Sequence, residues 1–261
     1  MSKQIEIKKL LDQKVRQYNK IDFIEKDPIC IPHQFTKQQD IEIAAFFAAI
    51  FAWGNRTTII NKSNELLNRM DHAPYEFCLQ HDAKDLKKII GFVHRTFNDT
   101  DALYCIEFFK HHFQHQQSLE TAFFTNQVTG KQIKSVEAAL THFQTYFMSL
   151  EDSPKRTKKH IASPVSGSTC KRLNMFLRWM VRKDEQKVDF GIWKSIKPSA
   201  LIIPIDVHVA RVSRSIGILK RPQTDWQAAL ELTDYCRTLD AKDPVKYDFA
   251  LFSLGVIEKF I

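Results

Sequence analysis

The chain of 261 residues contains only seven glycines, and no segment alternates strictly between apolar and polar residues. Because such alternation is the pattern of a half-buried strand, its absence argues against a sheet-based fold. Apolar residues instead recur at spacings of three and four, which predicts an all-α fold. No apolar run is long enough to span a membrane, and residues 1–19 are typical of an amphipathic helix and not of a signal peptide.

Clustered cysteines are also absent. The five cysteines are scattered and odd in number, and no Cys-x-x-Cys pair occurs. This argues against a zinc or iron–sulfur site held by neighbouring thiolates, and it favours a reducing, cytoplasmic location. The histidine cluster at His111, His112 and His115 has no acidic or cysteine partner nearby, so we expect a solvated helix face, with neither metal nor cofactor.

Acidic residues are missing from one long segment. Between Lys155 and Lys183 there are nine Lys or Arg residues and no Asp or Glu, whereas the whole chain has a net charge of +8. A localised positive segment attracts a phosphate backbone, which points to double-stranded DNA as the partner. A solvated surface or an acidic protein partner would explain the same pattern.

Helical periodicity and its end signals predict most elements directly. The stretch 38–53 is apolar all round and should be a central core helix that ends before Gly54. Residues 152–169 collect Ser, Pro, Gly and Lys, which indicates an exposed loop. We further expect helices over 1–19, 57–70, 74–81, 83–94, 99–113, 118–124, 135–148, 171–181, 207–215, 225–239 and 246–257, and a short one over 190–196.

Asp206 stands between Pro204 and an amphipathic helix. Proline disfavours helix before it, and aspartate is a preferred N-cap residue, so Asp206 should begin the helix that starts at Val207. A capping role alone would account for this residue. It could equally hold a carboxylate in a fixed direction for chemistry.

Lys171 falls in the first turn of its predicted helix. The positive end of the helix dipole and the neighbouring Arg172 both favour the neutral amine, which is the nucleophilic form. A lysine here could instead bind phosphate. Lys183 and Lys187 are alternative nucleophiles that lie closer to Asp206 in sequence, but neither begins a helix.

The segment Pro204-Ile205-Asp206-Val207-His208-Val209-Ala210-Arg211-Val212 is similar to the motif that carries the essential aspartate of the helix-hairpin-helix DNA glycosylase superfamily. Residues 45–67, with the break at 53–56, resemble the opening core helices of that superfamily, and residues 247–255 resemble its closing helix. Together these segments place the resemblance over most of residues 38–257, from its first core helices to its closing helix. The chain resembles a divergent bacterial branch.

The chain departs from the pattern of this superfamily in its hairpin and at its C-terminus. Residues 164–171 read Pro-Val-Ser-Gly-Ser-Thr-Cys-Lys, so the usual two-glycine hairpin before the lysine is degenerate, and the C-terminal four-cysteine cluster is missing. The spacing of 35 residues between Lys171 and Asp206 is most similar to the archaeal 8-oxoguanine glycosylase type. The resemblance implies a single two-lobed unit with a cleft between its lobes, one lobe formed by 37–185 and the other by 1–36 with 190–261.

What the resemblance implies for function is an N-glycosylase and lyase of base-excision repair, acting on a damaged base such as an oxidised purine. Lys171 would attack the sugar with help from Asp206. Trp53, Asn55 and Arg56 would form the base pocket or wedge. DNA would be held by Lys155, Arg156, Lys158, Lys159, Gly167, Ser168, Thr169, Arg172 and Arg211.

Two other functions remain open at this point. The chain could be a non-catalytic nucleic-acid-binding protein in which Lys171 only contacts phosphate, or a helical adaptor whose basic loop docks an acidic protein. In each case we expect a monomer. Borohydride trapping and the salt dependence of DNA binding separate the three.

Overall fold

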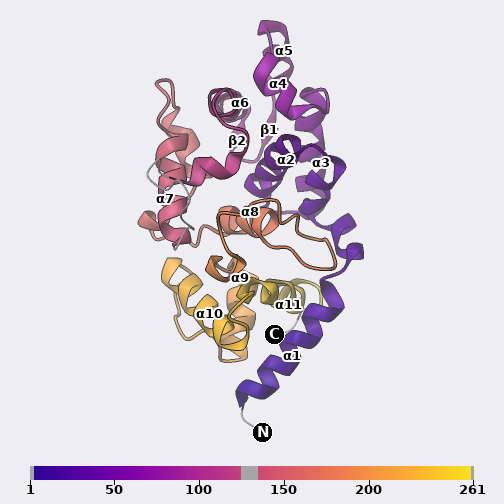
Figure 1. The fold of residues 1–261 in the computed structure, drawn as a ribbon, viewed down its shortest axis with the longest axis vertical. Coiled ribbons are helices and arrows are strands. Elements are labelled where there is room, and N and C mark those ends of the chain that lie inside the picture. The colour runs from indigo at the N-terminus through magenta and orange to yellow at the C-terminus, as the bar shows by residue number, and fades with distance from the viewer. Residues whose placement is uncertain (1–2, 125–134, 260–261) are drawn as a thin grey trace. The chain divides into compact units, whose positions relative to one another are not determined.

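A computed structural model describes residues 3–124 and 135–259 (Figure 1). Within these residues the predicted all-α class is confirmed. The described strands are β1 (Val93–His94) and β2 (Phe97–Asn98), which pair antiparallel as a minimal hairpin. Contacts divide the chain into two compact units, which are described separately below.

Unit 1 comprises the described residues 3–23, 135–137 and 163–259. Its core forms where α11 packs against both α1 and α9, and Figure 1 shows α9 and α11 side by side. Phe23 adds an edge-to-face contact with Phe249 at 5.3 Å between ring centroids. The helices of this unit are α1 (Lys3–Tyr18), α8 (Lys171–Val181), α9 (Val207–Ser215), α10 (Trp226–Leu239) and α11 (Tyr247–Val256).

Unit 2 comprises the described residues 24–124 and 138–162. The apolar segment that was predicted to form a central core helix does form one. Every residue from Ile41 to Phe51 is buried. Phenylalanines dominate this core, as in the edge-to-face contact of Phe46 with Phe109 at 5.2 Å. The helices are α2 (Gln38–Phe51), α3 (Arg56–Arg69), α4 (Pro74–Gln80), α5 (Ala83–Ile89), α6 (Asp99–Phe113) and most of α7 (Val136–Phe147).

Three predicted elements differ in the structure. The helix expected over 83–94 ends at Ile89, since Gly91 adopts a left-handed φ of 81° and the chain turns into β1. Residues 190–196 form no helix. The segment expected at 118–124 is the short 3-10 helix Leu119–Phe123.

The unit boundary also differs from the expected lobes. A lobe of 37–185 would group α8 with the helices before it, whereas α8 belongs to unit 1 with α9 and α11. The cause is that α8 is buried from Leu173 to Val181, and that Arg178 in it and Arg182 at its C-cap pair with carboxylates of unit 1. Among the helices that the structure describes, none has both the length and the apolarity required to cross a membrane.

Candidate functional site

Lys171 and Asp206 meet in unit 1. Lys171 is the first residue of α8, Asp206 is the N-cap of α9, and the Lys171 Nζ lies 3.7 Å from Asp206 Oδ2. About a quarter of each side chain is exposed, at 26% and 22% respectively. An amine and a carboxylate are therefore brought together where solvent and a substrate can reach them.

The two oxygens of Asp206 have different partners. Oδ1 accepts the backbone N–H groups of His208 and Val209 at 2.9 and 3.0 Å, which confirms the predicted cap. Oδ2 is the oxygen that faces Lys171. Since the cap fixes the direction of the carboxylate, capping and pairing are compatible roles of one side chain.

A tight turn delivers Lys171 to this position. Gly167 and Cys170 both have left-handed backbones, with φ of 76° and 49°. The turn is tied down because Gly167 O accepts the backbone N–H of Trp226 at 3.0 Å and Thr169 O accepts the side-chain amide of Asn174 at 3.0 Å. The backbone N–H of Gly167 donates to Pro164 O at 2.8 Å, so this predicted phosphate donor is engaged within the turn.

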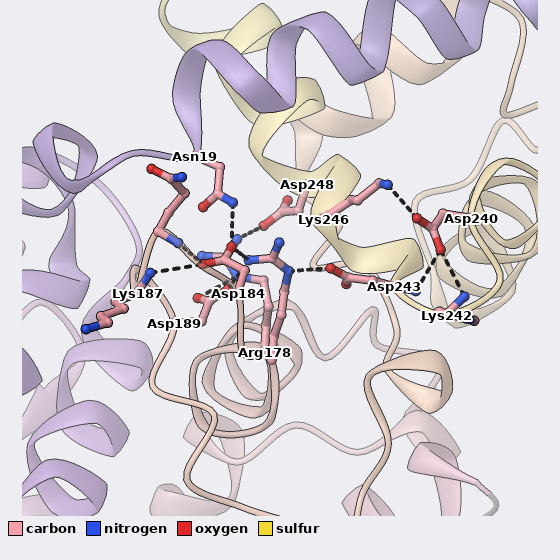
Figure 2. Close-up of polar contacts among 12 residues, drawn as sticks. Asn19, Arg178, Asp184, Lys187, Asp189, Asp240, Lys242, Asp243, Lys246 and Asp248 are labelled. Atoms are coloured by element: carbon pink, nitrogen blue, oxygen red, sulfur yellow. Dashed lines mark hydrogen bonds and ion pairs between the residues drawn. The ribbon is translucent and has the colours of Figure 1, made fainter.

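Two buried arginines, one in α8 and one at its C-cap, lie in a group of carboxylates in unit 1, and Figure 2 shows Arg178 among them. Arg178 pairs with Asp189 at 3.3 Å and with Asp248. Arg182 pairs with three carboxylates, those of Asp189 at 3.0 Å, Asp184 at 2.5 Å and Asp243 at 2.9 Å. We call these six residues the buried charge network.

The buried charge network reaches the Lys171–Asp206 pair through Asp248. The pKa of Asp248 is raised to about 6, chiefly by burial and also by the negative charges of Asp206 and Asp189, while Arg178 and Lys171 act in the opposite direction. Burial likewise raises the pKa of Asp243, although Arg182 opposes this. Burial alone would lower the pKa of Arg182, but its carboxylate partners, led by Asp189, raise it well above the usual range.

The acid-free segment 155–183 is less positive at its surface than its sequence indicates. Arg156, Arg178 and Arg182 are paired with carboxylates from elsewhere in the chain. Arg156, a predicted DNA contact, lies 3.0 Å from buried Asp101 and donates to Thr96 O at 2.9 Å. Lys155, Lys158 and Lys159 are exposed in unit 2, and Arg172 is half-buried in unit 1.

Part of the predicted exposed loop is in fact structured. Residues 155–160 form a 3-10 helix, in which Thr157 is buried and donates to Asp101 Oδ1 at 2.7 Å. Ser168 and Thr169 in the later turn are half-buried. The expectation of a fully exposed loop over 152–169 is therefore wrong, because Asp101 needs buried partners.

Arg211, another predicted DNA contact, bridges two helices of unit 1. Its guanidinium donates to Gly255 O of α11 at 3.1 Å, and its side chain remains exposed. Gly255 lies so close to α9 that an added Cβ would stand 3.2 Å from both the Cβ and the carbonyl oxygen of His208. Arg211 therefore has a structural role whether or not it contacts DNA.

The predicted wedge residues lie at the end of α2 in unit 2. Asn55 is the N-cap of α3 and accepts the Thr58 N–H at 3.1 Å, while Arg56 is the first residue of that helix. Trp53 is half-buried, and the Arg95 guanidinium lies 4.5 Å from its ring. Gly54 makes room for this arginine, because a Cβ there would lie 2.5 Å from Arg95 Nη1.

Sequence reasoning missed Arg95 because the helix predicted over 83–94 ends directly before it, which left Arg95 in a connection without an assigned role. In the structure it stands at the hairpin tip with a φ of 58°, exposed, stacked on Trp53. The signal available was Gly91, which marks the end of the preceding helix.

The histidine cluster is not simply a solvated face. His112 is buried, contacting Tyr146 Oη at 3.2 Å and Ser118 O at 3.0 Å, and burial lowers its pKa. Within residues 3–124 and 135–259, no group of three or more His, Cys, Asp or Glu side chains is arranged to hold a metal ion. The five cysteines are free thiols.

Comparison with known families matches residues 27–257 to the family described as "Protein of unknown function (DUF2400)". The chain belongs to this family. No match was found among curated proteins, and none among solved structures. The assignment to the helix-hairpin-helix glycosylase superfamily is therefore wrong. The segment 204–212 that suggested it has the pattern of any aspartate-capped amphipathic helix after a proline, and the two-glycine hairpin that would have distinguished the superfamily is missing.

Proposed function

We propose that this chain, a member of the DUF2400 family, is a DNA N-glycosylase and β-elimination lyase that removes a damaged base such as an oxidised purine. Lys171 is the nucleophile in this proposal, and Asp206 assists it. The observation that supports it is the 3.7 Å separation of Lys171 Nζ from Asp206 Oδ2, with both groups partly exposed at helix starts.

The first step requires a neutral amine, because an ammonium group has no lone pair with which to attack. Asp206 Oδ2 accepts the ammonium proton. The separation of 3.7 Å is longer than a hydrogen bond, and rotation of the flexible lysine side chain closes it. Asp206 stays in place meanwhile, because its Oδ1 is held by two backbone amides.

Attack on C1′ of the deoxyribose then forms the N–C1′ bond as the glycosidic bond breaks. The bonding electrons leave with the base, which takes up a proton, and opening of the sugar at O4′ gives a protonated imine. Loss of a C2′ proton expels the 3′-phosphate and cleaves the strand, and water releases the lysine. The Asp206 carboxylate stabilises the positive charge of the sugar and of the imine.

The damaged nucleotide has to leave the duplex for this chemistry, since C1′ is inaccessible to a side chain while the base is stacked. Exposed lysines, including Lys155 and Lys158, supply contacts to the phosphates. We assign Trp53, at the end of α2, one of two roles. It fills the space that the extruded base leaves in the duplex, or it stacks on the extruded base.

Borohydride trapping tests the proposal. Duplexes that contain an abasic site, uracil or 8-oxoguanine are incubated with the protein and reduced. We expect a covalent adduct with at least one duplex, and a loss of about a hundredfold or more in Lys171→Ala and in Asp206→Asn. Asn preserves the helix cap, so the second variant removes the charge and keeps the fold.

Lys187→Ala is the matched control, because Lys187 is an exposed lysine of the same unit and was an alternative nucleophile in sequence. It should trap like the wild type. Absence of an adduct with all three duplexes contradicts lyase activity. Salt-dependent binding without an adduct would indicate the non-catalytic nucleic-acid-binding protein, and no binding at low salt would indicate the helical adaptor.

A further inference from the structure

Three asparagines lie on one face of α3 in unit 2. Asn61, Asn64 and Asn68 are spaced by three and four residues, which places their side chains along one side of the helix. Asn61 and Asn68 are exposed, and Asn64 is half-buried. Asparagine is among the poorer helix formers, because its amide competes for backbone hydrogen bonds. The formation of α3 therefore does not account for these three residues, which we call the asparagine row.

The asparagine row borders a cavity of about 540 Å³ that residues of α3 and α5 line. A cavity of this volume can hold a small organic molecule. None of its residues takes part in the Lys171–Asp206 pair or in the buried charge network. The lining residues are Asn61, Asn64, Glu65, Asn68, Arg69 and Lys88.

The charged side chains of this cavity are already paired. Glu65 contacts Lys62 at 2.7 Å and Arg69 at 2.8 Å, and Lys88 contacts Asp71 at 2.7 Å. Paired charges exert little net attraction on an ion. The cavity is therefore suited to a neutral group, and any charge of the ligand would lie outside it.

Arg69 presents a fixed plane at the cavity. Its Nη1 donates to Lys88 O at 2.8 Å and to Ile90 O at 3.0 Å, and its Nη2 donates to Glu65 Oε1 at 2.8 Å. The guanidinium also lies over the ring of Phe92, with Cζ 5.8 Å from the ring centroid, and 28% of the side chain is exposed. Because three acceptors fix its orientation, the guanidinium is a flat surface on which a planar ring can stack.

Side-chain amides suit the edge of a nucleobase. An amide carries a donor and an acceptor side by side, and asparagine pairs in this way with N6 and N7 of adenine. Asn64 Oδ1 accepts Gln34 Nε2 at 2.9 Å, which leaves the Asn64 NH₂ group for a ligand, and the exposed amides of Asn61 and Asn68 can both donate and accept. An inorganic anion would use donors alone, and a carbohydrate has no planar ring to stack on Arg69.

We propose that this cavity is a second binding site, which takes an adenine base stacked on Arg69 and held at its edge by the asparagine row. The base belongs to a free nucleoside or nucleotide, or to an unpaired nucleotide of a DNA strand. The residues of this site lie in unit 2, whereas Lys171 and Asp206 lie in unit 1, and the inference does not rest on the proposed function.

Isothermal titration calorimetry of the full chain tests the inference with adenosine, AMP and a single-stranded tetranucleotide of deoxyadenosine. We expect adenosine to bind saturably with a Kd of about 1 mM or tighter. AMP should bind with similar affinity, because the cations of the cavity are paired. Tighter binding of the tetranucleotide than of adenosine would identify a DNA strand as the source of the base, and equal or weaker binding a free nucleoside or nucleotide. No saturation with any adenine probe, or binding of glucose or inorganic phosphate in their place, overturns the inference.

Variants then locate the site. Asn64→Ala and Asn68→Ala should each weaken adenosine binding by about fivefold or more, and Arg69→Lys, which keeps the charge without the plane, should weaken it as well. Gln80→Ala is the matched control, because Gln80 is an exposed amide at the end of α4 in the same unit and does not line the cavity. It should bind like the wild type. Unchanged binding in either asparagine variant, or an equal loss in the control, overturns the inference. These probes contain no damaged base or abasic site, so their outcome is independent of borohydride trapping.

Discussion

Lys171 Nζ and Asp206 Oδ2 lie 3.7 Å apart although 35 residues separate them in the sequence. Each stands at the start of a helix, and each helix contacts α11. An amine beside a carboxylate could be an ordinary surface ion pair, which contributes little to stability. This pair differs from an ordinary surface ion pair because it lies next to the buried charge network. Asp248, a member of that network, interacts electrostatically with both Lys171 and Asp206.

The centre of the buried charge network should be important for stability. Asp189 is fully buried and pairs with both Arg178 and Arg182, so Asp189→Ala leaves two buried guanidinium groups short of a partner. We expect a loss of about 3–5 kcal/mol in the free energy of unfolding, measured by urea denaturation. Asp234→Ala removes an ion pair of similar length, 2.6 Å, from a carboxylate that is 68% exposed, and should cost less than about 1 kcal/mol. Equal losses would contradict this prediction.

Asp248 should make the stability of the protein depend on pH. Its folded-state pKa of about 6 is above the value of about 3.9 for an unfolded aspartate. Its contribution to stability is thus fully present below about pH 4 and is lost as pH rises through 6. Relative to Asp248→Asn, the wild type should lose about 2 kcal/mol between pH 4 and pH 7. Urea midpoints at both pH values measure this, and a constant difference would contradict it.

Exposed lysines of the 3-10 helix over 155–160 should set the salt dependence of DNA binding. Replacing Lys155 and Lys158 with alanine should weaken binding to undamaged duplex and reduce the slope of log affinity against log salt by about 2. Fluorescence anisotropy at several salt concentrations measures the slope. The double variant of Lys84 and Lys87, two exposed lysines on α5 of the same unit, is the control and should keep the wild-type slope. A loss of slope in the control alone would contradict the assignment.

Trp53 and Arg95 should act on DNA as one unit, because the guanidinium is stacked on the indole ring. Trp53→Ala and Arg95→Ala should each weaken duplex binding, and the double variant should be weakened by clearly less than the sum in free energy. Arg95→Lys retains the charge but not the planar stack, and should bind more weakly than the wild type. Additive losses, or wild-type binding by all variants, would contradict this prediction.

The sequence predicted those features that depend on local signals. The apolar stretch of α2, the N-cap at Asp206 and the start of α8 at Lys171 each follow from neighbouring residues, and the structure shows all three. The end of α5 was misplaced because Gly91 was included in the helical periodicity.

The buried charge network was not predicted, because it depends on packing between distant segments. Arg178 and Arg182 were counted as surface charges, although Arg178 lies in a buried stretch of α8 and Arg182 directly follows it as the C-cap. Asp248 was read as part of an apolar closing helix. A single charge within such a helix was the available signal, since it can be buried there only with a partner.

The role of Lys171 as nucleophile is best tested by identifying the residue that becomes attached to DNA. The protein is incubated with a duplex that contains an abasic site, reduced with borohydride and digested, and the modified peptide is sequenced by mass spectrometry. We expect the sugar remnant on Lys171, in the peptide that begins the α8 helix. Attachment to a different lysine or to the N-terminal amine, or no attachment at all, would contradict it.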